Sequence, residues 1–246
     1  MTLSEPPKNQ IDAFLRLGIE LESDTMRCGI EIRNLSKSDY KREWLDCRLI
    51  LVSVIRFTHM FRSGIPGKTN ESISNRLQLI AQYAQGVGLT ETAISEGLYV
   101  KANALLKQDY EILTRIREYK AGAVKVGKTP NVKHAPEGSQ QFYGDLNSVA
   151  HPSNPDLLAA LTRQHIDGEI AGVSSSPVYL RETACSHYEL HVWITLEIAR
   201  EALLLSCEMY DKHEDMMDLS LPFRMFLTAV KSLESVGFEV ETSTRE

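Results

Sequence analysis

Cysteine is scarce in this sequence, and its spacing excludes a disulfide or zinc framework. The 246 residues include four cysteines, at positions 28, 47, 185 and 207, and no two of them form a C-x-x-C pair. Widely separated thiols are typical of a reduced protein rather than of a secreted disulfide scaffold or a zinc ribbon. We therefore expect free thiols, no metal site and no cofactor.

Long apolar segments are also missing. The longest run, LILVSVI at 49–55, is bounded by Arg48 and Arg56 and is far too short to span a bilayer. The N-terminal residues MTLSEPPKNQ are polar and include two prolines, which does not match a signal peptide. These absences predict a cytoplasmic protein with no membrane contact.

Basic residues are fewer than acidic residues in this chain. The chain has 27 lysines and arginines against 33 acids, for a net charge of −6, which argues against broad coating of nucleic acid. Apolar residues make up 43% and charged residues 24% of the chain, close to the averages of soluble globular proteins. The length suits one helical domain with a substantial core.

Helical periodicity dominates what is present. Ile11, Phe14, Leu15, Gly18 and Ile19 begin an i, i+3, i+4 pattern that recurs along the chain. The predicted helices lie near 11–34, 38–63, 71–85, 90–121, 138–150, 154–164, 177–210 and 221–235.

Glycines and loops set the predicted boundaries. We expect Gly86 and Gly88 to stop the third helix and Thr90 to cap the fourth. Segment 168–179 is rich in Gly, Ser and Pro and forms either a loop or a small hairpin. The sequence thus predicts an all-α fold, a single and mostly antiparallel bundle of seven or eight helices. If it divides at all, the sub-domain break falls near 122–137.

A polar row precedes a proline near the middle of the chain. Tyr143, Asn147 and His151 are spaced four apart, so they lie on one side of a short helix that Pro152 ends. His151 at a helix end can simply bond free carbonyl groups there. Alternatively, the row lines a groove in which His151 is a general acid or base. The sequence favours the structural role and leaves the catalytic one open.

The same segment carries a family resemblance. The pattern Tyr143-x-x-Leu146-Asn147-x-x-Ala150-His151-Pro152, after the stretch ALLKQDYEILTRI, resembles a family of all-helical bacterial proteins over roughly residues 45–210. That family is distantly similar to the HEPN group (higher eukaryotes and prokaryotes nucleotide-binding). The resemblance implies a helical fold and the site residues Lys107 and Glu111. Asn147 stands where the family usually has Ser, and Lys107 where it usually has Arg.

Some HEPN proteins are metal-independent ribonucleases with an Arg-x4–6-His motif, and Arg181 and His187 match that spacing here. A histidine would activate the ribose hydroxyl and the arginine would stabilise the charged phosphorane. Six residues do not place two side chains on one helix face, and a match of this kind is expected by chance. His187 and His191 share a face but have no evident third metal ligand.

A lysine-rich loop follows the fourth predicted helix. Lys125, Lys128 and Lys133 lie in it, where they could bind phosphates or RNA or could simply be solvated. Trp193, Ile194 and Ile198 are expected in the core or at a dimer interface.

The function predicted from these observations is a non-catalytic binding or accessory module in a regulatory or defence context, with a homodimer or protein partner. The alternative is a metal-independent ribonuclease, in which RNA is the partner.

Overall fold

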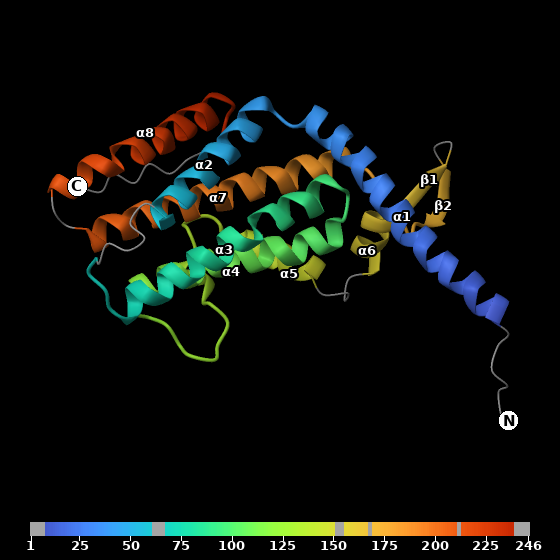
Figure 1. Ribbon diagram of the computed structural model, residues 1–246, viewed down its shortest axis with the longest axis horizontal. Coiled ribbons are helices and arrows are strands. Elements are labelled where there is room, and N and C mark those ends of the chain that lie inside the picture. Colours follow the sequence, from blue (N-terminus) through green and yellow to red (C-terminus); the bar gives the residue numbers. More distant parts are fainter. Residues whose placement is uncertain (1–7, 61–66, 151–154, 167–168, 211–212, 239–246) are drawn as a thin grey trace.

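The fold is an elongated bundle of helices with one small hairpin (Figure 1). The computed structural model describes residues 8–60, 67–150, 155–166, 169–210 and 213–238. The elements in these ranges are α1 (Lys8–Asp39), α2 (Arg42–Met60), α3 (Glu71–Ser95), α4 (Tyr99–Lys120), the 3-10 turn η1 (Val132–His134), α5 (Gln140–Ala150), α6 (Pro155–Thr162), β1 (Arg163–Ile166), β2 (Glu169–Val173), α7 (Arg181–Met209) and α8 (His213–Ser235). The all-α prediction is confirmed.

Helix α7 is the central element of the bundle. It packs against α2, α3, α4 and α8, and α1 reaches it from one end. Ile194 and Ile198 of α7 have no exposed surface, as predicted, and neither has Leu51 of α2. Burial of one such side chain stabilises the fold by roughly 1.5–3 kcal/mol. Within the ranges that the structure describes, none of the helices has the length and apolar content needed to cross a membrane.

The predicted end of the third helix is wrong. Helix α3 runs through Gly86 and Gly88 to Ser95, because burial of Ile94 outweighs the roughly 1 kcal/mol that each interior glycine costs. The helix stops at Gly97, whose φ is +77°, and a Cβ there would lie 2.4 Å from the Val178 carbonyl oxygen. Thr90 therefore lies inside α3 and does not cap α4.

The remaining boundaries differ by smaller amounts. The small hairpin exists, but its antiparallel strands lie at 163–166 and 169–173, upstream of most of the predicted segment. Helix α7 begins at Arg181 rather than near 177, and α8 begins at His213 and contains Pro222. The lysine loop connects α4 to α5, and α5 then packs back onto α4.

Candidate functional site

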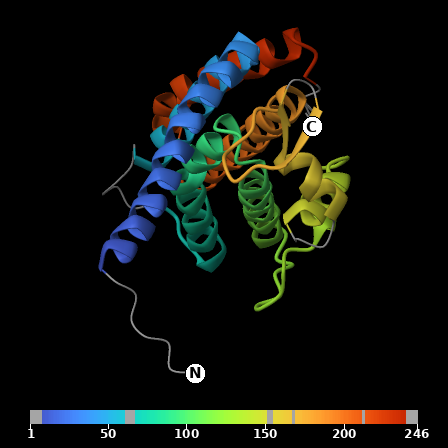
Figure 2. The ribbon, with the colours of Figure 1, turned by 90° about the vertical axis from the view of Figure 1, so that its right-hand side faces the viewer.

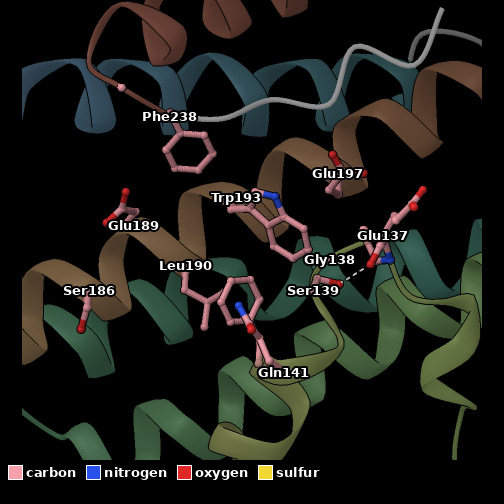
Figure 3. A pocket seen from close by; sticks show the side chains of 13 residues that line it. Glu137, Gly138, Ser139, Gln141, Ser186, Glu189, Leu190, Trp193, Glu197 and Phe238 are labelled. Carbon is pink, nitrogen blue, oxygen red and sulfur yellow. Dashed lines mark hydrogen bonds between the residues drawn. The ribbon is translucent and has the colours of Figure 1, made fainter.

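A groove of about 560 Å³ opens where three separate segments meet (Figure 3). One wall is a face of α7, with side chains spaced by three and four residues: Ser186, Glu189, Leu190, Trp193 and Glu197. The other walls are the turn before α5 and the two residues Gly237 and Phe238 after α8. Its volume is within the usual range of ligand pockets.

The turn before α5 depends on one glycine and one tyrosine. The Ser139 amide donates to the Pro136 carbonyl at 3.1 Å, and Gly138 between them has φ of +77°. A positive φ at this position is characteristic of a type II turn and favours glycine. The Tyr110 hydroxyl of α4 donates to the Ser139 carbonyl oxygen at 2.9 Å. This bond fastens the turn to the body of the bundle.

The third wall follows from the way α8 ends. The Phe238 amide donates to the Leu233 carbonyl at 3.1 Å, and the Gly237 amide donates to Glu234 at 3.0 Å. Gly237 has φ of +83°, so the chain closes the helix with a left-handed glycine cap. The cap turns the chain so that the buried Phe238 ring lies above Trp193 in the groove (Figure 3).

Aromatic rings form the floor of the groove. The Trp193 ring lies edge-on to the Phe142 ring, with 5.7 Å between centroids and 71° between planes. The Tyr110 ring is nearly parallel to the Trp193 ring, with 6.4 Å between centroids and 24° between planes. Trp193 is half-buried, so part of the indole remains open to solvent. Trp193 packs against the core without being fully buried, and its place at a dimer interface stays a prediction.

The charge in the groove is negative. Glu137 and Glu189 are exposed at its rim, whereas Glu197 is buried. The lining within the described residues contains no lysine, arginine or histidine. Glu197 is neutralised from behind, since an Nη nitrogen of Arg117 and one of Arg200 each lie 2.7 Å from its carboxylate oxygens. The exposed charges of the groove lining, Glu137 and Glu189, are therefore both negative.

Part of the predicted polar cluster comes together between α4 and α5. The Tyr143 hydroxyl donates to Glu111 Oε1 at 3.2 Å, and Lys107 Nζ lies 3.9 Å from the same oxygen. Lys107 Nζ also lies 5.7 Å from the centre of the Tyr143 ring. Partial burial, and then the Glu111 carboxylate, raise the pKa of Tyr143. Asn147 is half-buried one turn along α5, and His151 lies outside the described residues.

Arg181 and His187 have separate partners. Arg181 is exposed and lies 3.1 Å from Asp39 at the end of α1. The His187 Nε2 atom accepts from the Asn103 side-chain amide at 2.6 Å, and the ring also bonds the Thr183 backbone. Burial lowers the pKa of His187 to about 4. The ring is therefore neutral at pH 7, with both nitrogens occupied.

His191 is also neutral and, unlike the half-buried His187, is fully buried. It has no exposed surface, and Arg48 Nε donates to its Nε2 at 3.1 Å. Burial, and then the Arg48 charge, lower its pKa to about 3. In the described ranges, no group of three or more His, Cys, Asp or Glu side chains is arranged to hold a metal ion.

The lysine loop is fastened through its backbone. The Asn131 amide donates to Glu118 Oε1 at 2.6 Å, and Arg115 donates to the Lys128 carbonyl. Lys125, Lys128 and Lys133 are exposed. The structure thus places the three predicted binding lysines on the surface and leaves phosphate binding a prediction.

Sequence reasoning missed a buried carboxyl group on α4. Asp109 is 5% exposed, and Thr90 Oγ1 of α3 donates to its Oδ2 at 2.8 Å. Burial raises the pKa of Asp109 to about 7, although the Thr90 hydrogen bond acts in the opposite direction. In the sequence, Asp109 looks like an ordinary charged residue on the polar face of a helix.

The groove itself was missed because its walls come from residues 136–142, 186–197 and 237–238. One signal was available, namely Glu189 and Trp193 one turn apart on a helix that otherwise has buried faces. No protein-family model, curated protein or solved structure matches the chain.

Proposed function

We propose that this chain is a non-catalytic binding module whose groove takes the cationic end of its ligand. The observation that carries the proposal is the pairing of a partly exposed tryptophan with two exposed carboxylates, in a lining without basic side chains. The ligand class that fits is an aliphatic ammonium or a guanidinium group.

The physical basis is the attraction of a cation to both features. A cation over the face of a tryptophan gains about 0.5–2 kcal/mol, and an exposed carboxylate adds about 0.2–1 kcal/mol. Glu189 precedes Trp193 by one turn of α7, so one ligand group can reach the carboxylate and the ring together. The alkyl part of the ligand then packs against Phe142 and Leu190, which line the same floor.

The non-catalytic part of the proposal is supported by the state of the internal histidines. His187 and His191 are neutral, and their Nε2 atoms accept hydrogen bonds from Asn103 and Arg48. A general base needs a free nitrogen near its substrate and a pKa near the working pH. Neither ring meets these conditions.

The cationic group can come from a free organic cation or from a lysine or arginine of a partner protein. The fluorescence of Trp193 can detect either source of the cation. The only other tryptophan, Trp44, is buried and can be replaced by phenylalanine to leave a single fluorescent indole. We would titrate the Trp44→Phe protein with spermidine, with tetraethylammonium and with a short Lys/Arg peptide. An acidic peptide of the same length is the control.

We expect saturable quenching of Trp193 by the cations and none by the acidic peptide. Glu189→Gln should weaken binding about threefold and Glu137→Gln/Glu189→Gln about tenfold, with a smaller effect at high salt. The matched control is Glu182→Gln, an exposed acid on the first turn of α7 outside the groove. Equal quenching of Trp193 by the basic and the acidic peptide would refute the proposal, and so would an unchanged affinity for the cations in Glu137→Gln/Glu189→Gln. Response to the peptide alone would identify a protein as the source of the cation.

A further inference from the structure

The N-terminal part of α1 extends past the bundle without packing on it. Residues 8–24 are all exposed, and the helix is buried only at Gly29, Ile32 and Ser36. Figures 1 and 2 show this part of the helix standing clear of the other elements. Among the described residues, α1 carries nine of the seventeen large apolar side chains that are exposed. A helix in water is stabilised mainly by packing of its apolar face.

The exposed stripe continues the face that α1 already uses. At 100° per residue, positions spaced by three and four stay on one side of a helix. One such series runs through the free part and into the buried part of α1: Ile11, Phe14, Gly18, Leu21, Thr25, Gly29, Ile32 and Ser36. In the buried part, Ser36 Oγ donates to the Ser95 carbonyl and the Gly29 position adjoins Glu96. Residues 8–24 carry the same apolar face, but no other element of this bundle packs against that face in the described part of the chain.

We propose that residues 8–25 of α1 pair in antiparallel orientation with the same residues of a second copy of this chain. The register that we propose places the Phe14 ring opposite a glycine. When Phe14 faces the partner's Gly18, Ile11 faces the partner's Leu21, and the twofold axis repeats both contacts. A Cβ at Gly18 would meet nothing within 4 Å, so the site is open to receive a ring. The Phe14 ring opposite Gly18 gives the interlocking that helix pairs need, and the twofold axis makes this contact twice.

The charge of this part of α1 argues for a second copy over a membrane surface. The polar positions between 8 and 27 carry four acids, Asp12, Glu20, Glu22 and Asp24, against Lys8, Arg16 and Arg27. Helices that lie on anionic membranes have a basic polar face. A polar face without excess positive charge lacks this attraction, whereas an apolar stripe whose residues can pair with themselves suits a twofold contact.

The test is the mass of the full chain in solution, measured by light scattering after size exclusion between about 1 and 100 µM protein. We expect about twice the monomer mass of 27.7 kDa. Phe14→Glu/Leu21→Glu should weaken association about 100-fold or more, because each change occurs twice in the dimer. Ile19→Glu is the matched control, since Ile19 is also exposed but lies about 120° from the stripe.

A swap of the large and small residues tests the register. Phe14→Gly and Gly18→Phe should each weaken the dimer, and the double variant should restore it, since it again opposes one ring to one glycine. Urea unfolding of all variants should be alike at concentrations below the dissociation constant of the dimer, because residues 8–24 bury nothing in the monomer. A monomeric wild type, a dimer that survives Phe14→Glu/Leu21→Glu, failure of the swap, or binding of the wild type to anionic vesicles as a monomer would each overturn the proposal.

Discussion

Replacing Asp109 by asparagine is expected to stabilise the protein above neutral pH and to change it much less in mild acid. Asparagine has nearly the same shape, and its amide oxygen can still accept the hydrogen bond of Thr90. What the substitution removes is the charge that the wild-type carboxyl must carry at high pH in a site that is 5% exposed. The experiment therefore isolates the free energy of ionising one buried group.

The magnitude follows from the shift in pKa. The pKa of Asp109 rises from 3.8 to about 7 on folding. Between these values the folded state holds a proton that the unfolded state has released, so the stability of the wild type falls as pH rises. Each pH unit in this window is worth about 1.4 kcal/mol. From pH 5 to pH 8, across roughly two such units, the advantage of Asp109→Asn should therefore grow by about 3 kcal/mol.

Urea unfolding at pH 5 and pH 8, followed by circular dichroism, measures this difference directly. The neutral His187 and His191 make the wild type less stable below about pH 6.5, but they do so equally in the variant and cancel in the comparison. Asp145→Asn, an exposed acid on α5, is the control and should show no growth. The same advantage for Asp109→Asn at both pH values, with unchanged m-values, would show that the carboxyl is not buried as described.

Three further outcomes test other parts of the structure. Arg117→Ala should destabilise the fold by about 1–3 kcal/mol in urea unfolding, because it removes one of the two arginines that pair with the buried Glu197 and leaves Arg200 in place; a loss below about 1 kcal/mol, the usual size for an exposed pair, would contradict this. Gly237→Ala should lower the free energy of unfolding by about 1–2 kcal/mol, since its φ of +83° strains any residue with a Cβ. The same change should weaken cation binding in the groove, and an unchanged titration would show that the helix cap does not shape the binding site. Total RNA incubated with the protein in chelator should stay intact, because His187 is neutral and fully hydrogen-bonded; cleavage that disappears with His187→Ala or His151→Ala would instead support the ribonuclease alternative.

Helix content was predictable because the apolar period of the chain is strong, whereas helix ends depend on tertiary contacts. Gly86 and Gly88 look like stops in the sequence, yet neither has a positive φ, and α3 continues to bury Ile94. Gly97 is the actual stop, since the Val178 carbonyl lies where its side chain would be. That neighbour is far away in sequence, so no local pattern distinguishes Gly97 from the other two glycines.

The site shows the same limit. Lys107 and Glu111 are four apart on one helix, and Tyr143 meets them because α5 folds back onto α4. The four-residue spacing in the sequence identifies Lys107 and Glu111, whereas Tyr143 is recognised only from the fold.

The groove could not be predicted from spacing at all, because Trp193, Glu137 and Phe238 come from three segments that a turn and a helix cap bring together. Neither the turn nor the cap carries a catalytic signature in its sequence.

The ion pairs between α4 and α7 have a mechanical consequence. Glu197 and Glu201, one turn apart on α7, both face cations of α4, with Arg117 Nη2 at 2.7 Å from the first and Lys120 Nζ at 3.2 Å from the second. Sliding of α7 along α4 would strain the pairs of Glu197 with Arg117 and of Glu201 with Lys120, so these pairs oppose such a movement. Trp193 lies one turn before Glu197 on the same helix. If the groove binds a ligand as proposed, we expect the turn at 136–139 or Phe238 to adjust to a large ligand while the indole keeps its position.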